Sequence, residues 1–202
     1  MKLLIATTNP GKIREFREML GDSRYDWDDL SAHRELPPAA ETGRTFRANA
    51  CLKAAYYARL LNTHAIADDS GLAVDALDGK PGVHSARWAE IHSAGKGDAD
   101  NNRLLLSQLA NVPDAQRTAR FMCVLALADP QGRILLTAQD SVEGRIIHSP
   151  RGHNGFGYDP LFLVEGIDQT AAELPSARKH EISHRGKALR RLRSLIDSTL
   201  FR

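Results

Sequence analysis

Cysteine is scarce in this 202-residue sequence, which contains two, Cys51 and Cys123. They lie far apart in apolar contexts without a Cys-x-x-Cys spacing, so we expect reduced core thiols rather than a zinc site or a disulfide. No apolar run approaches the roughly 18 residues that a membrane helix needs. Met1-Lys2 leads directly into Leu3–Ala6 without a small-residue cleavage site, so a signal peptide is not indicated. We therefore expect a cytoplasmic protein that binds no membrane.

An excess of charge of one sign is also missing. The chain has 27 Lys and Arg against 25 Asp and Glu, which gives a formal net charge of +2. Proteins that bind nucleic acid usually have a stronger basic excess or a basic stripe, so the balance favours a small anionic ligand and no nucleic-acid partner is expected. No linker-like stretch divides the chain, and residues 1–202 are predicted to form a single domain.

A short apolar run, Ala65–Ala67, ends abruptly in Asp68-Asp69-Ser70-Gly71, and apolar residues then resume in a second predicted strand, Leu72–Leu77. This pattern is typical of a buried strand whose carboxyl end delivers charge to the crevice where open α/β sheets bind ligands. Two adjacent acids in such a crevice could hold a hard cation such as Mg2+, which prefers oxygen ligands and is often shared with substrate phosphates. The alternative is a plain turn, because Asp, Ser and Gly are turn formers.

A second candidate site is the loop after a strand predicted at residues 2–7. The loop consists of Thr7, Thr8, Asn9, Pro10, Gly11 and Lys12. Apolar residues at helical spacing follow it, so the order strand, loop and helix is predicted. Such a loop can direct backbone N–H groups, the positive end of a helix and one lysine at a phosphate. It is not a Walker A loop, and the alternative is a plain strand-to-helix turn with a solvated lysine.

A helix is expected after Thr42 or Thr45, either of which could cap it. Within it, Asn49 and Lys53 are four residues apart and therefore lie on one face. Lone polar residues on a helix are usually solvated. This pair would matter for function only if its face lines a binding cleft.

Glycines and aromatic residues alternate in the segment Ser149–Pro160, which contains Phe156 and Tyr158. Glycine lets a ligand approach the backbone, and either aromatic ring could stack on a flat base. Asp159 precedes a proline, which favours an extended backbone. The alternative is a structured loop whose aromatic side chains anchor it in the core.

Basic residues open the last predicted helix. Lys179, His184 and Arg185 near a helix N-terminus would suit a polyphosphate, because an arginine can bind two oxygens at once. The alternative is a basic helix start that is only solvated.

Six stretches of the chain follow one another in a distinctive order. They are Thr7-Thr8-Asn9-Pro10-Gly11-Lys12, Glu41-Thr42-Gly43-x-Thr45-Phe46, Ala67-Asp68-Asp69-Ser70-Gly71-Leu72, Pro81-Gly82, Gly155-Phe156-Gly157-Tyr158-Asp159-Pro160 and Ile182-Ser183-His184-Arg185. Together they resemble the ordered motifs of the inosine/xanthosine triphosphate pyrophosphatase family. The resemblance spans nearly the whole chain.

The resemblance implies an α/β fold with an elongated mixed sheet, flanking helices and two lobes around a central nucleotide cleft, usually in a homodimer. It also implies Mg2+-dependent hydrolysis of dITP, ITP and XTP to the monophosphate and pyrophosphate, which removes deaminated purines from the nucleotide pool.

The resemblance also implies roles for single residues. Asp69 matches the general base and a metal contact, Ser70 matches a substrate contact, and Lys53 matches a lysine of the cleft helix. The Thr7–Lys12 loop matches the loop that contacts phosphate. The remaining matches are the base-holding segment Phe156, Gly157, Tyr158 and Asp159, and the further substrate contacts Lys179, His184 and Arg185.

One departure from the family concerns the metal. Members commonly have Glu-Asn-Ala where this chain has Ala48-Asn49-Ala50, and that glutamate resembles an acid close to the metal. Glu41 or Asp68 could substitute for it, or Mg2+ could rely on water and substrate oxygens. Activity could also be reduced.

Two other functions stay open at this point. One is a pyrophosphatase for another modified nucleotide, such as a modified pyrimidine triphosphate, as in the related septum-formation inhibitor family. The other is a nucleotide-binding protein with impaired catalysis, which Ala48 leaves possible. A nucleic-acid role ranks third.

Overall fold

The computed structural model describes residues 2–20, 25–33 and 35–199, and within them a seven-stranded mixed sheet is flanked by helices. The strands are β1 (Lys2–Ile5), β2 (Asp26–Asp29), β3 (His64–Val74), β4 (Lys80–Pro81), β5 (Thr118–Ala128), β6 (Ile134–Ile146) and β7 (Phe162–Val164). Their order is β2-β1-β3-β5-β6-β7, with β4 paired to β3. The pairs β1–β2 and β1–β3 are parallel, whereas β3–β4 and β6–β7 are antiparallel. The predicted α/β class with a mixed sheet is confirmed.

The α-helices of the described residues are α1 (Pro10–Leu20), α2 (Phe46–Leu60), α3 (Trp88–Ile91), α4 (Asp98–Gln108), α5 (Ser176–Ile182) and α6 (His184–Thr199). Short 3-10 helices lie at Leu30–Ala32, Asp75–Leu77, Gly82–Arg87 and Asp114–Gln116. In this part of the chain no helix has both the length and the apolar character that crossing a membrane requires.

The chain forms two compact units. Unit 1 comprises residues 1–69, 123–140 and 185–202, and unit 2 comprises residues 70–122 and 141–184. The boundaries fall inside β3, β5 and β6, so each of these strands contributes residues to both units. The expectation of a single domain over residues 1–202 stays a prediction.

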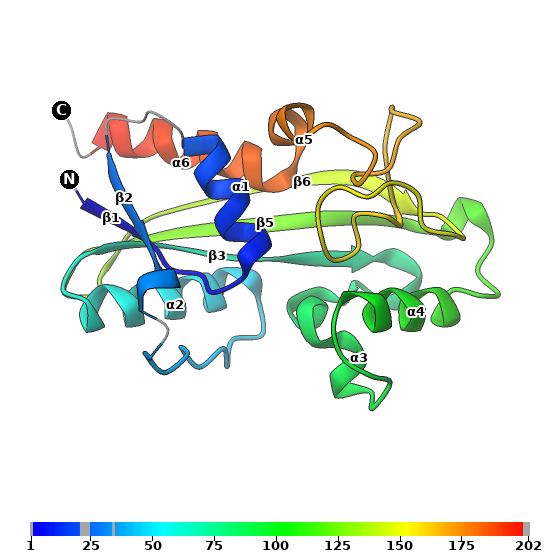
Figure 1. Ribbon diagram of the computed structural model, residues 1–202, viewed down its shortest axis with the longest axis horizontal. Helices are drawn as coiled ribbons and strands as arrows, with labels where there is room; N and C mark the ends of the chain where they lie inside the picture. The colour runs from blue at the N-terminus through cyan, green and yellow to red at the C-terminus, as the bar shows by residue number, and fades with distance from the viewer. Residues whose placement is uncertain (1, 21–24, 34, 200–202) are drawn as a thin grey trace. The chain divides into compact units, whose positions relative to one another are not determined.

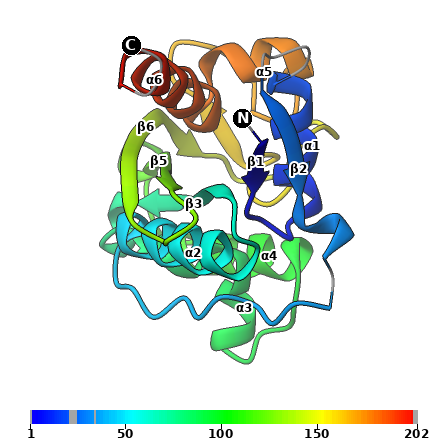
Figure 2. The same ribbon diagram turned by 90° about the vertical axis from the view of Figure 1, so that its left-hand side faces the viewer.

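In unit 1, helices cover both faces of the sheet: α1 and α6 lie on one side and α2 on the other (Figures 1 and 2). Side chains alternate along a strand. Ile66 therefore packs in one core with Phe16 of α1 and Leu192 of α6, whereas its neighbours Ala65 and Ala67 pack in a second core with α2. This second core consists largely of alanines, namely Ala6, Ala50, Ala54, Ala58, Ala65, Ala67, Ala126 and Ala128.

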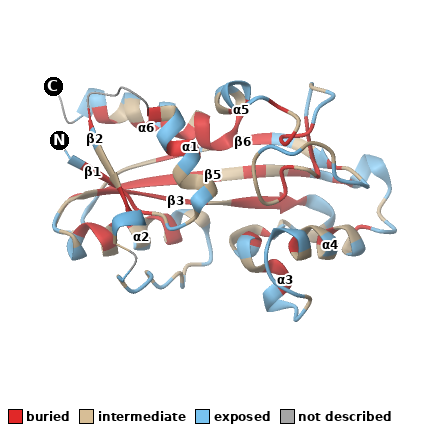
Figure 3. Cartoon of the chain, in the orientation of Figure 1, coloured by how far each residue is buried: buried red, intermediate tan, exposed pale blue. Residues whose placement is uncertain are grey.

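The strand pattern continues through the acidic stretch, because β3 runs without a break from His64 to Val74. The alternative of a plain turn at Asp68-Asp69-Ser70-Gly71 is therefore wrong, and so is the expectation that the strand ends there. Apolar residues resume at Leu72 and Val74, which lie in the core of unit 2 and hold the strand beyond the acids. Most of β3 and β5 is buried along its length (Figure 3).

In unit 2, a buried arginine helps to fix the chain. Arg117 is 1% exposed, and its guanidinium donates to the carbonyl oxygens of Leu109 (2.7 Å), Ile146 (2.7 Å) and Ile147 (3.3 Å). Burial lowers the pKa of Arg117, although Asp114 opposes this shift. The three carbonyls satisfy the donors and tie the end of α4 to the end of β6.

Replacing Leu192 by Ala tests the α6 side of the unit 1 core. Leu192 is 0% exposed and belongs to that core, so Leu192→Ala should lower the free energy of unfolding by about 2–5 kcal/mol through lost burial and a residual cavity. Urea denaturation measures the change. Leu52 in α2 is 42% exposed, and Leu52→Ala should cost less than about 1 kcal/mol. Equal losses for the two variants would contradict this core.

Candidate active site

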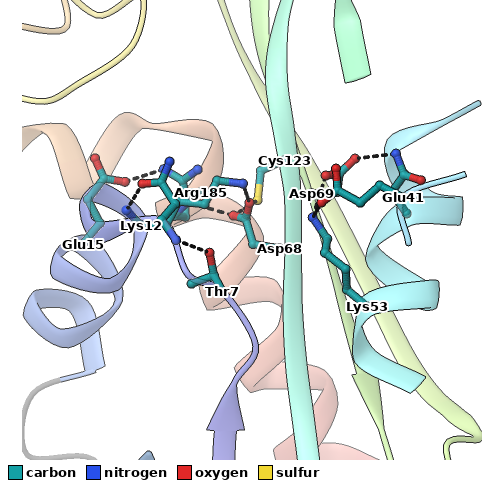
Figure 4. Close-up of polar contacts among 11 residues, drawn as sticks. Thr7, Lys12, Glu15, Glu41, Lys53, Asp68, Asp69, Cys123 and Arg185 are labelled. Carbon is teal, nitrogen blue, oxygen red and sulfur yellow. Dashed lines mark hydrogen bonds and ion pairs between the residues drawn. The ribbon is translucent and has the colours of Figure 1, made fainter. Parts of the chain in front are cut away.

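Asp68 and Asp69 are adjacent in β3, but their side chains point to opposite faces of the strand (Figure 4). The alternation described for Ala65, Ile66 and Ala67 sets this arrangement. Asp68 faces α1 and α6, and Asp69 faces α2. The two carboxylates therefore lie in different surroundings and contact different residues.

Asp68 sits in a buried ion cluster. Arg185 donates from Nε to Asp68 Oδ2 at 2.8 Å, and the Lys12 ammonium pairs with Asp68 Oδ1. Arg185 also pairs through Nη1 with Glu15 of α1, and the Cys123 thiol donates to Asp68 Oδ2 at 3.2 Å. Burial alone would raise the pKa of Asp68, but Arg185 and Lys12 outweigh it and hold this pKa well below its usual value. Asp68 is thus a fixed anion that organises two cations.

The cysteine prediction can be judged at this cluster. Both cysteines are free, Cys123 being buried and Cys51 half-buried. Burial, with a smaller contribution from the nearby Asp68 carboxylate, raises the pKa of Cys123 well above its usual value. Cys123 is therefore a protonated thiol that acts as a hydrogen-bond donor.

Asp69 lies among residues of α2 and the segment before it. Lys53 Nζ is 2.7 Å from Asp69 Oδ1 and 2.9 Å from Glu41 Oε1, so one ammonium bridges two carboxylates. Asn49 Nδ2 donates to Asp69 Oδ2 at 3.3 Å. Burial raises the pKa of Asp69 even though Lys53 opposes the shift. A buried carboxylate with a raised pKa and held orientation is well suited to accept a proton.

Local sequence explains why α2 presents these groups. Thr45 is the N-cap, and its hydroxyl accepts from Ala48 N at 3.1 Å, so Thr45 rather than Thr42 starts the helix. Asn49 Oδ1 accepts from Gly43 N at 2.8 Å, which fastens the segment that carries Glu41. A Cβ atom at position 43 would lie 2.6 Å from Asn49 Oδ1, so glycine is required there.

The Thr7–Lys12 loop opens α1 as predicted. Asn9 Oδ1 accepts from Lys12 N at 3.0 Å, which satisfies one of the open N–H groups at the helix start, and Pro10 is the first helical residue. Thr7 Oγ1 accepts from Asn9 N at 3.2 Å. The loop is therefore held by hydrogen bonds within itself, and Lys12 lies beside Asp68. Its contact with phosphate stays a prediction.

In unit 2, Asp159 organises the predicted base-holding segment. Its Oδ2 accepts from Phe156 N at 2.9 Å and from Lys179 Nζ at 2.6 Å, and the Lys179 ammonium is 5.3 Å from the centre of the Phe156 ring. Lys179 is 6% exposed, so it is not a solvated surface residue.

Tyr158 is a core anchor. It is 3% exposed, its hydroxyl donates to Ser85 O at 3.0 Å, and burial raises its pKa. Ser85 Oγ also accepts from Leu72 N and donates to Gly82 O, so one serine joins three of the motifs. Of the two aromatic rings proposed to stack on a base, Tyr158 matches the alternative of a packing residue, which leaves Phe156 for stacking.

The two residues at the start of α6 are buried as well. The His184 ring stacks on Phe121, with 5.0 Å between ring centres and an interplanar angle of 16°. Arg185 is 2% exposed and held by Asp68 and Glu15. The alternative of a solvated basic helix start is therefore wrong, while the substrate contacts of His184, Arg185 and the half-buried Ser70 stay predictions.

The structure thus groups the predicted residues unit by unit. In unit 1 it brings together Lys12, Asp68 and Arg185 on one face of β3, and Glu41, Lys53 and Asp69 on the other. In unit 2 it brings together Phe156, Asp159 and Lys179, and Tyr158 belongs to the core of that unit.

Sequence reasoning missed two residues of unit 1. Asn49 was noted for its spacing from Lys53 but not as a site residue. Glu15 was not singled out, although an acid three residues after Lys12 in a helix shares the face of that lysine. Its burial at 4% exposure depends on Arg185, which is distant in sequence.

The residues of unit 1 that would suit a metal ion are the carboxylates Glu41 and Asp69. No cluster of three or more His, Cys, Asp or Glu suited to a metal occurs among the described residues. Glu41 and Asp69, however, already share one cation, the Lys53 ammonium. Two carboxylates with remaining positions filled by water and phosphate fit Mg2+. Asp68 does not fit, because it lies on the other face and its oxygens bind Lys12 and Arg185.

Neutralising each acid in turn separates the two roles. Asp68→Asn should lower the free energy of unfolding by about 3–5 kcal/mol, because it leaves Lys12 and Arg185 in a buried cluster without their shared anion. Asp69→Asn should cost less than about 1.5 kcal/mol, because Lys53 keeps Glu41. Denaturant unfolding at pH 7 measures both changes.

The effect of pH on the stability of Asp68→Asn provides a control for the role of the Asp68 charge. The pKa of Asp68 is lowered in the folded state, so its stabilising contribution is complete above the unfolded-state pKa of about 3.9 and is lost as pH falls below it. The stability gap between the unaltered protein and Asp68→Asn should therefore shrink as pH falls from about 5 towards 3. A gap that widens in that range would contradict this account.

Comparison with known proteins bears on the whole chain. The model of the Ham1 family matches residues 3–195. The dITP/XTP pyrophosphatase of Exiguobacterium sibiricum is 49% identical over 200 residues, which cover 99% of each chain, and that of Bacillus subtilis is 46% identical over 195 residues, which cover 96% of each.

Solved structures agree with the sequence matches. A HAM1 protein from Coxiella burnetii has a TM-score of 0.85 and 38% identity, covering 98% of this chain and 100% of its own. A nucleoside-triphosphatase, dITP/XTP pyrophosphatase, from Mycobacterium abscessus has a TM-score of 0.75 and 42% identity, covering 95% and 98%. These matches confirm the family inferred from the six motifs, and the chain belongs to the Ham1 family.

Proposed function

We propose that this protein hydrolyses the non-canonical purine nucleoside triphosphates dITP, ITP and XTP to the monophosphate and pyrophosphate, and so removes them from the nucleotide pool. The observation that carries the proposal is the Asp69 carboxylate, which is buried and held by Lys53 and Asn49. The names of relatives such as the dITP/XTP pyrophosphatase of Bacillus subtilis support the substrate class.

Asp69 is proposed to orient a water molecule and accept its proton as the water attacks the α-phosphorus. The bond from the α-phosphorus to the oxygen that bridges it to the β-phosphorus breaks, and pyrophosphate leaves with that oxygen. Lys53 holds the Asp69 carboxylate and stays paired with Glu41 after Asp69 has taken up the proton. Lys12, at the start of α1, is held by Asp68 and is proposed to contact the phosphates together with the helix N-terminus. Lys179 and Arg185 are the further cationic contacts.

Glu41 and Asp69 are the residues that would hold Mg2+. When bound there, the ion would neutralise charge on the triphosphate. Ala48 supplies no third carboxylate, so the remaining ligands would be water and substrate oxygens.

Base selection is proposed to occur at Phe156–Asp159. Hypoxanthine and xanthine carry a 6-oxo group where adenine has an amine, so a hydrogen-bond donor at this position selects for them. The N–H groups of Phe156, Gly157 and Asp159 are already donated to Asp159, Asp98 and Phe156. This favours a side-chain donor, and His184 and Arg185 are the candidates.

The finer structural expectations belong to this proposal as well. They are the elongated arrangement of two lobes around a central nucleotide cleft, the homodimer and the cytoplasmic location. Each was inferred from the resemblance or from composition and stays a prediction.

Pyrophosphate release from dITP, XTP and dGTP, with and without Mg2+, tests the activity. We expect Mg2+-dependent hydrolysis of dITP and XTP but not of dGTP, and at least about a 100-fold loss of kcat in Asp69→Asn because the proton acceptor is removed. Asp168→Asn is the matched control, since the Asp168 side chain is 94% exposed.

Three results would contradict the proposal: equal rates on dGTP, turnover independent of Mg2+, or full activity in Asp69→Asn. Nucleotide binding without turnover would favour a binding protein with impaired catalysis, for which Ala48 is the motivating observation. Turnover confined to modified pyrimidine triphosphates would favour the other alternative.

Ala48→Glu tests whether the metal site lacks a ligand. Ala48 faces the segment that carries Glu41, because a Cβ atom at position 43 would lie 2.7 Å from Ala48 Cβ. The new carboxylate should lower the Mg2+ concentration that gives half-maximal activity by about 3-fold to 10-fold, since carboxylate count tunes the affinity for hard cations. A Mg2+ titration of dITP hydrolysis measures this value.

Ala99→Glu places the same side chain in the first turn of α4, where Ala99 is exposed, and should leave the half-activating Mg2+ concentration unchanged. If Ala48→Glu leaves it unchanged as well, position 48 takes no part in metal binding.

A further inference from the structure

Two residues of α4 hold the main chain on both sides of Gly157. Asp98 Oδ2 accepts from Gly157 N at 2.7 Å, and Asn102 Nδ2 donates to Gly157 O at 3.0 Å. Asp98 and Asn102 are four residues apart, so they project from the same face of the helix. Both peptide groups that flank Gly157 are therefore fixed by one turn of α4.

Gly157 needs this support because of its backbone conformation. Its φ of +63° is left-handed, and a Cβ atom there would meet nothing within 4 Å. The glycine is thus present for its conformation and not for lack of space. Glycine populates several backbone regions with similar ease, so the two hydrogen bonds select the one that is observed.

Hydrogen bonding determines which atom of the Asn102 carboxamide faces Gly157. Gly157 O is an acceptor, so the group that faces it is the Nδ2 amide. Asn102 Oδ1 is then buried without a hydrogen-bond partner among the described residues. A buried acceptor without a partner is destabilising, and native structures tolerate few of them. The hydrogen bond from Asn102 to Gly157 O is therefore made at a cost in stability.

Other residues hold the rest of the segment. Asp159 binds Phe156 N and Lys179, and the Tyr158 hydroxyl binds Ser85 O. These contacts fix residues 156, 158 and 159, and α4 supplies the contacts that fix residue 157. The groups proposed for the chemistry, Glu41, Lys53 and Asp69, are held by one another and by Asn49 within unit 1.

We propose that Asp98 and Asn102 are positioning residues that determine base specificity, because they fix the Gly157 peptide groups and with them the direction of the Phe156 ring. The inference rests on the proposed function, in which residues 156–159 hold the purine base. We call the hydrogen bonds of Asp98 and Asn102 to Gly157 the brace. Removing either hydrogen bond should weaken the preference for hypoxanthine over guanine and raise KM, and it should leave kcat nearly unchanged.

Four variants test the brace. Asn102→Asp is nearly isosteric and places an acceptor against the Gly157 carbonyl. Asp98→Ala removes the acceptor for Gly157 N, and Asp98 is exposed, so folding should be preserved. Asp98→Asn keeps an acceptor oxygen and is the conservative rescue. Arg103→Ala, one residue beyond Asn102, is the matched control, because its side chain is 69% exposed and pairs with Asp100.

The readouts are kcat and KM for dITP and dGTP, together with calorimetric binding of dIMP and dGMP. In Asn102→Asp and Asp98→Ala we expect KM for dITP to rise about 10-fold and the preference for dITP over dGTP to fall about 10-fold, with kcat within about 2-fold. Asp98→Asn should recover most of the preference, and Arg103→Ala should match the unaltered protein.

Unchanged preference in both Asn102→Asp and Asp98→Ala would overturn the inference, and so would a loss confined to kcat. The binding data separate this failure from failure of the proposed function. If the unaltered protein does not turn over dITP but binds dIMP better than dGMP, and the two variants lose that difference, the brace stands and the proposed reaction falls. If binding in the variants matches the unaltered protein, the brace falls whatever the rates are.

Discussion

The alternation of side chains along β3 is the constraint on which the site depends. Successive residues of a strand face opposite sides, so two consecutive acids cannot share one environment once helices cover both faces. In unit 1 helices lie on both faces, with α1 and α6 on one side and α2 on the other. The strand therefore divides one acidic pair into a structural anion, Asp68, and a candidate proton acceptor, Asp69.

The two environments push the pKa values of these carboxyls in opposite directions. Desolvation acts on both, but Asp68 has Arg185 and Lys12 to outweigh it, whereas Asp69 has Lys53, which is shared with Glu41. Separation of this kind is how a protein assigns different roles to chemically identical groups. Glu15 can be buried on the Asp68 side because its charge is balanced by Arg185. Glu15 and Asp68 with Lys12 and Arg185 form a cluster of two anions and two cations.

Much of this arrangement could be predicted from the sequence, and the exceptions have physical causes. The loop before α1, the start of the strand at Ala65, the cap of α2 at one of two expected threonines and the family motifs are local patterns and were found. The strand, however, continues through the acids to Val74, where its end had been expected at Asp68-Asp69. The faces of Asp68 and Asp69 could not be assigned without knowing which helix covers which side. Tyr158 was one of two aromatic residues predicted to stack on a base, and the structure buries it in the core. Its hydroxyl donates a hydrogen bond to the main-chain oxygen of Ser85, which is far away in sequence.

The alanine-rich layer between α2 and the sheet has a consequence for how this protein can vary. Eight buried alanines belong to that layer, and the helix that packs on it carries Lys53 and Asn49. Alanine is nearly the smallest side chain, so almost every substitution in the layer adds volume and moves α2 away from β3, and with it the groups that hold Asp69. The opposite layer, built of leucine, isoleucine and phenylalanine, can exchange shape at constant volume. Evolutionary drift in core packing should therefore be concentrated beneath α1 and α6, while the layer beneath α2 acts as a spacer of fixed thickness.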